Sequence, residues 1–183
     1  MKDEGRLKMK SVKAYLFGSA ATGPLKYLYP DYFGWDIARS IALTADGAGY
    51  FVLDGFGGVH ATGTARRPTG TYPYWPGWDI ARSIAVTLDS KGMVLLDGFG
   101  GVWKLGSVAR LPSDYFGFDI ARDISITPGG DGFVVLDGFG GIHRSGNVPA
   151  AQAIGYATYD RWRGFVIRNG RYTVVRNDGY AVT

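Results

Sequence analysis

Four aspartates, each followed three residues later by an arginine, are the side chains of this sequence best placed for chemistry. The pairs are Asp36 and Arg39, Asp79 and Arg82, Asp119 and Arg122, and Asp160 and Arg163. Such pairs can tie neighbouring strands together through bidentate, charge-assisted hydrogen bonds. Alternatively, four acids around a channel could hold a hard cation such as calcium or serve a hydrolase or lyase. Because every acid has an arginine in step, we predict structural ion pairs, no cofactor and no catalysis.

A second set of aspartates precedes glycine, where an Asp side chain can bond the backbone and Gly can take a positive φ. We predict that these acids hold turns rather than act as catalysts or metal ligands: Asp54, Asp97, Asp137 and Asp178. His60 and His143 stand where other units carry Trp103 and Tyr15, so this position requires a large flat side chain. We expect both histidines to be structural, because no second histidine at metalloenzyme spacing accompanies them. The absence of cysteine excludes disulfides, thiolate metal sites and Cys nucleophiles.

The segment before each Asp-Arg pair is rich in aromatic residues, as in "YPDYFGWD" and "PSDYFGFD". One aligned set lies directly beside the acids and is expected to pack between units: Trp35, Trp78, Phe118 and Tyr159. A second set lies further out on the loops and is predicted to bind a glycan or a protein, with packing as the alternative. It consists of Tyr32, Trp75, Tyr115 and Tyr156, extended by Tyr29 and Tyr74.

Basic residues collect at the two ends of a chain whose net charge is +4. If the ends meet, they form a basic seam that includes Arg161, Arg163, Arg168, Arg171 and Arg176. Solvated surface charge is the default interpretation, and docking of an anionic partner is the alternative. The sequence contains no nucleic-acid-reading motif, no apolar run long enough to span a membrane and no convincing signal peptide. It leaves the compartment open.

The elements that position these residues follow from a segment that occurs three times, at residues 35–60, 78–103 and 118–143, and once more in degenerate form from Asp160. Within a unit, "ARSIAVT" alternates apolar and polar residues, "GMVLLD" is an aliphatic run, and "DGFGG" is a turn before "GVWKLG". This pattern predicts a three-stranded meander, with an outer fourth strand as an option in the variable connections. The 29 glycines and the single glutamate also favour strands over helices.

We therefore predict one all-β domain over residues 1–183, with repeats at about 31–73, 74–113, 114–154 and 155–183. The last copy stops before its final strand, and "KAYLFGSA" at residues 13–20 matches "GVWKLGSV" at 101–108. Segment 11–23 is thus predicted to complete the last unit and to close a four-repeat β-propeller with three- to four-stranded blades. A homo-oligomer that exchanges this strand, a ring of two chains and a β-trefoil are the alternatives.

The units resemble NHL-like β-propeller repeats, and more closely the WDIAR and LDGFGGVH repeats of bacterial, often secreted or surface-associated, propeller proteins. The resemblance covers residues 31–147 and, more weakly, 156–183. It implies a scaffold for binding and an extracellular or surface location, without specifying a ligand. We expect a non-catalytic binding or assembly module that recognises a glycan or protein through loop aromatics. The alternative is a structural subunit of a larger surface or virion-type assembly.

Overall fold

The computed structural model describes residues 33–150, 155–168 and 171–182. These residues contain no helix and form four three-stranded antiparallel sheets, so the predicted all-β class is confirmed. We call the sheets blades 1 to 4 in chain order. Blade 1 comprises β1 (Ala38–Leu43), β2 (Gly49–Asp54) and β3 (Val59–Gly63), and blade 2 comprises β4 (Ala81–Val86), β5 (Gly92–Asp97) and β6 (Val102–Gly106). Blade 3 comprises β7 (Ala121–Ile126), β8 (Gly132–Asp137) and β9 (Ile142–Gly146), and blade 4 comprises β10 (Trp162–Arg168), β11 (Arg171–Arg176) and β12 (Ala181–Val182).

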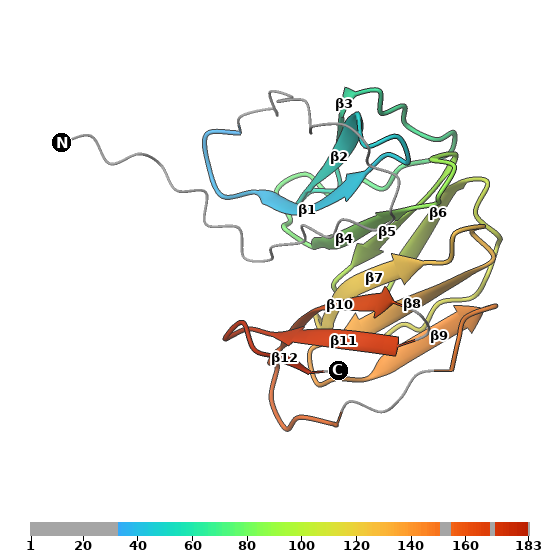
Figure 1. Cartoon of the computed structure of the whole chain (residues 1–183). Coiled ribbons are helices and arrows are strands. Elements are labelled where there is room, and N and C mark those ends of the chain that lie inside the picture. The colour runs from blue at the N-terminus through green and yellow to red at the C-terminus, as the bar shows by residue number, and fades with distance from the viewer. Residues whose placement is uncertain (1–32, 151–154, 169–170, 183) are drawn as a thin grey trace.

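The blades stand side by side in an arc, and the first strand of each blade contacts the first strand of the next (Figure 1). Strand β1 meets β4, β4 meets β7, and β7 meets β10. In the part of the chain that the structure describes, β1 and β10 do not contact each other. The predicted closing segment, residues 11–23, lies outside the described residues. Closure of the arc into a ring therefore stays a prediction.

Three apolar cores fill the spaces between adjacent blades. Phe51 and Leu53 of blade 1 pack with Ile84 and Met93 of blade 2, and the equivalent residues of later blades repeat the arrangement. Every residue of β5 and of β8 is buried, because blades 2 and 3 are covered on both faces. Burying one such aliphatic side chain contributes roughly 1.5–3 kcal/mol. Packing between blades is thus the main force that holds the arc together.

The aspartate of the DG sequence holds the turn between the second and third strands in blades 1 to 3. In blade 1, Asp54 Oδ1 accepts the backbone N–H groups of Phe56 and Gly58, both at 2.9 Å. Gly57 within this turn has a φ of 92°, a conformation that favours glycine. Asp97 and Asp137 make the same pair of bonds. These aspartates are buried, so they satisfy backbone donors that would otherwise have no partner.

Blade 4 has a different register from the one that the sequence alignment predicts. Trp162 pairs with Arg176 as Ala121 pairs with Asp137, so Arg176 and not Asp178 takes the turn-aspartate position. The alignment of Asp178 with Asp137 was wrong, because the hairpin between β10 and β11 is shorter than the one between β7 and β8. The predicted turn role of Asp178 is confirmed, since it precedes Gly179, whose φ is 83°, and bonds the turn backbone. Asp178 lies two residues further on, where its Oδ1 accepts the Tyr180 N–H at 3.1 Å.

Blade 4 also contains a third strand of its own, contrary to the expectation that this copy stops before it. Strand β12 is short and pairs only with Val174 and Val175 of β11. In blade 3, by comparison, β9 pairs with β8 from Gly132 to Leu136. Completion of blade 4 by segment 11–23 is not addressed by the described residues.

Candidate binding face

The predicted Asp-Arg pairs form one continuous ladder along the first strands of the four blades. Arg122 shows the pattern: its Nη1 donates to Asp119 of its own blade at 2.9 Å, and its Nη2 donates to Asp160 of the next blade at 2.7 Å. Arg39 bridges Asp36 and Asp79, and Arg82 bridges Asp79 and Asp119. Arg163 reaches only Asp160 in the described residues. The ladder therefore joins each blade to the next.

Two of the ladder carboxylates have a lowered pKa although they are partly buried. Burial raises the pKa of Asp119, but hydrogen bonds and charge from Arg82 and Arg122 outweigh it and lower the pKa below its usual value. The pKa of Asp160 is lowered by the same balance. The ladder acids of blades 2 to 4 also pack against the glycine of the preceding blade's turn: a Cβ on Gly98 would lie 2.2 Å from Asp119 Oδ1. The DG glycine is therefore required for this close approach.

Buried polar side chains add a second link between blades that the sequence analysis did not single out. Asp123 is fully buried, and its carboxylate accepts the Ser83 hydroxyl at 2.7 Å and the Phe165 N–H at 3.0 Å. Ser40 occupies the equivalent position in blade 1 and accepts the Ile84 N–H. The signal in the sequence was a polar residue one position after the ladder arginine in blades 1 to 3.

The aromatic set beside the ladder acids is exposed, so the prediction that it packs between blades was wrong. Trp35 is 60% exposed, and its equivalents are more than half exposed as well: Trp78, Phe118 and Tyr159. The space between blades is already filled by aliphatic side chains of the second strands, which leaves these rings on the rim.

The outer aromatic set is also exposed, except that Tyr74 and not Trp75 is its member in blade 2. Tyr115 is 73% exposed and Tyr156 is 75% exposed. Trp75 does not belong with them: its N–H binds Phe56 O as the Phe116 N–H binds Phe99 O. Its half-buried ring packs edge-on against Trp103, with centroids 4.9 Å apart. Tyr74 takes the exposed position in blade 2 instead. Tyr29 and Tyr32 lie outside the described residues.

The phenylalanine of each DGFGG turn lies between the two exposed sets, and sequence reasoning missed this. Phe99 stacks on Tyr115 at 5.9 Å with an interplanar angle of 13°, and it contacts Trp78 at 5.8 Å. Phe139 repeats this arrangement with Phe118 and Tyr156, and Trp35 contacts Phe56. We call this surface the aromatic belt: Trp35, Phe56, Tyr74, Trp78, Phe99, Tyr115, Phe118, Phe139, Tyr156 and Tyr159. The recurrence of the turn phenylalanine in "DGFGG" was the available signal.

The two histidines are bound to turn aspartates. His143 Nε2 lies 2.9 Å from Asp137 Oδ2, and its Nδ1 lies 3.0 Å from Asp114 Oδ2. The hydrogen bond that His143 makes to Asp137 raises the pKa of His143 above its usual value, against the effect of burial. His60 contacts Asp54 at 2.9 Å in blade 1. With a carboxylate on each ring nitrogen, His143 has no nitrogen left to activate a nucleophile.

The basic seam is only partly visible in blade 4. Arg163 belongs to the ladder, Arg176 pairs with Asp178, and Arg161 stacks over the Tyr159 ring at 5.3 Å. Nothing is described of the Arg168 and Arg171 side chains. Within the described residues, no group of three or more His, Asp or Glu side chains could share a metal ion. No described helix is long and apolar enough to cross a membrane.

The fold and the belt together define an all-β protein of repeated blade-like sheets with one aromatic rim. Comparison with known protein families finds no matching family model. Comparison with curated protein sequences finds no match either. Function must therefore be argued from the site itself.

Proposed function

We propose that this protein is a non-catalytic, NHL-like β-propeller module that binds glycans along its aromatic belt. The observation that carries the proposal is a group of three contacting rings, two exposed and one half-buried, that occurs twice: Trp78, Phe99 and Tyr115, and Phe118, Phe139 and Tyr156. Contiguous aromatic rings on a protein surface are unfavourable in contact with water, so such a patch commonly marks a surface that a partner covers. Flat apolar faces of sugar rings are suitable partners, because they stack on aromatic side chains while their hydroxyls remain accessible.

Polar groups for sugar hydroxyls lie directly next to the belt. Each exposed ring of the inner set is followed in sequence by a ladder aspartate, and the side chains of Asp79 and Asp119 remain about two-fifths exposed. Their carboxylates are already fixed by arginines, so accepting a hydroxyl requires no further ordering of these side chains. A repeated ring with a fixed acceptor beside it suits an extended chain of sugar units, because weak sites then act together.

The test removes the two exposed rings of one three-ring group and measures glycan binding. A Trp78→Ala and Tyr115→Ala double variant should lose at least about tenfold in affinity for whichever polysaccharide the wild type binds in affinity electrophoresis. Leu88→Ala is the matched control, because Leu88 is equally exposed but lies in the hairpin between β4 and β5, away from the belt. Failure of the wild type to bind any polysaccharide in a broad panel would overturn the proposal.

A second candidate, a subunit of a closed or larger assembly, is favoured by the two ends of the ladder. Among the described residues, Asp36 has one arginine partner and Arg163 has one acid partner, whereas the internal members have two. A contact between blade 4 and blade 1, within one chain or between two, would join these opposite charges. Asn177 stands where blades 1 to 3 have the close-approach glycine, so this contact would differ in geometry from the others.

Solution mass distinguishes the forms of this second candidate. Light scattering on the full chain and on a chain lacking residues 1–20 should show a monomer that unfolds or aggregates on truncation if the ring closes on itself. A dimer that dissociates on truncation would indicate strand exchange between chains. An unchanged, stable monomer in both samples would contradict closure through the N-terminal segment.

A further inference from the structure

Blade 4 differs from blade 3 at four positions that lie close together in the fold. Equivalent backbone hydrogen bonds and strand pairs establish which residue of blade 4 corresponds to which residue of blade 3. At them, Phe116 is replaced by Ala157, Ile120 by Arg161, Ala121 by Trp162, and Asp137 by Arg176. An apolar and acidic arrangement in blade 3 has become a basic one in blade 4.

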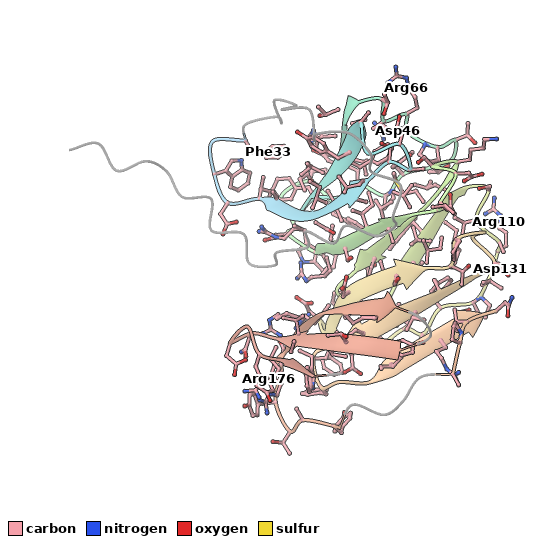
Figure 2. The ribbon with its side chains drawn as sticks, in the orientation of Figure 1. Phe33, Asp46, Arg66, Arg110, Asp131 and Arg176 are labelled. Carbon is pink, nitrogen blue, oxygen red and sulfur yellow. The ribbon has the colours of Figure 1, made fainter. Side chains whose placement is uncertain are left out.

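The exchanges leave a hollow where the other blades are filled. Ala157 lacks the ring that Phe116 packs against His143, and a cavity of about 280 Å³ opens there. Its walls are Gly155, Tyr156, Ala157, Arg161, Trp162 and Arg176. Figure 2 shows Arg176 at the end of blade 4, on the side of the molecule opposite Arg110. The hollow is large enough for one sugar-sized group.

Three side chains that line the hollow each contain a buried N–H donor without a partner in the described part of the chain. Nε of Arg161, Nε of Arg176 and Nε1 of Trp162 have no hydrogen-bond partner among the described residues. The Trp162 side chain as a whole is only 5% exposed. Leaving a buried donor unpaired destabilises the folded protein, and more strongly so when the donor belongs to a charged group. These three side chains therefore retain hydrogen-bonding capacity that the described fold does not use.

The charges of the hollow suit a single negative charge. Arg176 is neutralised in part by Asp178, whose pKa is lowered mainly by its hydrogen bond to the Tyr180 N–H and further by both arginines. Arg161 makes no ion pair within the described part of the chain. The guanidinium groups of Arg161 and Arg176 and the carboxylate of Asp178 give a net charge of +1. This charge matches a singly charged carboxylate or sulfate ester better than a doubly charged phosphate.

An aromatic platform adjoins the hollow. Tyr156 lines it and is also a belt ring that packs against Phe139 at 5.7 Å. Tyr159, the next belt ring, lies beneath the Arg161 guanidinium. A sugar ring stacked on Tyr156 could direct a charged substituent toward Arg161 and Trp162.

We propose that the hollow in blade 4 binds the carboxylate or sulfate group of an acidic polysaccharide whose sugar ring stacks on Tyr156. The inference rests on the proposed glycan-binding function and specifies its ligand class. The protein would then bind neutral sugar units of a glycan along blades 1 to 3 and an acidic sugar unit at blade 4.

The experiment compares polygalacturonate, dextran sulfate and neutral dextran in affinity electrophoresis at about 0.15 M ionic strength, where long-range attraction is screened. The wild type should bind at least one of the two acidic polymers more tightly than dextran, and the preferred polymer identifies the group as carboxylate or sulfate. Arg161→Gln should weaken that binding about ten- to a hundredfold. Ala157→Phe should weaken it as strongly, because the ring refills the hollow while both arginines remain.

Arg110→Gln is the matched control, since it removes one exposed arginine from the opposite side of the molecule. An equal loss in this variant would show general attraction to a basic protein and overturn the proposal. Undiminished binding by Ala157→Phe, with an unchanged circular dichroism spectrum, would also overturn it, as would equal competition by duplex DNA. If Trp78→Ala with Tyr115→Ala has no effect on any glycan while Arg161→Gln abolishes acidic binding, the belt proposal fails and the hollow stands.

Discussion

Blade 3 and blade 4 share strand order and antiparallel pairing, yet they use the turn after the second strand in different ways. In blade 3, Asp137 is buried, holds two backbone N–H groups and binds His143. In blade 4, Arg176 occupies that place with an unsatisfied Nε, and the turn acid is the exposed Asp178. The same backbone therefore carries a satisfied structural network in one blade and unpaired donors in the other.

The difference follows from position in the arc. Blade 3 is covered by blades 2 and 4, and every residue of β8 is buried. A change there disturbs two interfaces at once. In the described residues, blade 4 contacts only blade 3. An end blade can exchange packing residues for polar ones, because fewer neighbours depend on them.

The largest contrast between the two blades is expected from removal of the turn acids. Asp137→Ala leaves two buried backbone N–H groups and the Nε2 of His143 without their partner, and should lower the free energy of unfolding by about 3 kcal/mol. Asp178→Ala removes an exposed acid and should cost less than about 1 kcal/mol. Urea denaturation of both variants provides the comparison. Equal losses would show that the two turns do not differ energetically.

The ladder gives the next largest contrast. Arg122→Gln breaks the link to Asp119 and Asp160 together, and should cost about 2 kcal/mol. Arg163→Gln removes a single acid contact on a more exposed side chain, and should cost less than about 1 kcal/mol. The same denaturation measurement applies. A loss for Arg163→Gln as large as for Arg122→Gln would indicate that Arg163 has a second acid partner, as a closed ring would supply.

The turn acids of blades 2 and 3 provide a smaller contrast, because their pKa values move in opposite directions. Burial raises the pKa of Asp97, whereas for Asp137 the effect of burial is outweighed by the bond to His143 and by backbone N–H groups, and the pKa falls. Asp97→Asn should therefore change the free energy of unfolding at pH 7 by no more than about 0.5 kcal/mol. Asp137→Asn should cost measurably more, since it removes the charge that His143 uses. The reverse order would contradict the assigned partners.

The smallest expected effect is the pH dependence that His143 adds to blade 3. The pKa of His143 is raised in the folded protein, chiefly by the hydrogen bond to Asp137 and then by Asp114. Its stabilising contribution is therefore complete below the ordinary histidine pKa of about 6.5 and is lost as the pH rises through the higher folded value. The wild type should lose stability on going from about pH 6 to pH 8, and His143→Gln should lose less. Identical slopes in the two proteins would contradict this.

The sequence predicted the ladder better than the belt. The Asp-Arg spacing recurs once per unit, and the strands that carry it bring Arg39, Arg82 and Arg122 to an acid on the next blade. Exposure of Trp35 and Trp78 could not be predicted, because it depends on how completely the aliphatic cores fill the space between blades. Trp75 was aligned with Tyr115, whereas in the structure it corresponds to Phe116. The cause is a proline between Trp75 and Gly77 in "YPYWPGWD" that the equivalent segments lack. An alignment of residue types does not show where that extra residue is accommodated.

The sequence by itself determined the all-β class, the strand segments of blades 1 to 3 and the DG turns, because alternation, β-branched runs and Asp-Gly pairs act over a few neighbouring residues. Tertiary structure alone decided that Arg176 replaces a turn aspartate, that Ala157 leaves a hollow and that the belt faces outward. Strand register depends on hairpin length, and burial depends on what the adjoining blade supplies. Both are properties of contacts between segments far apart in the chain.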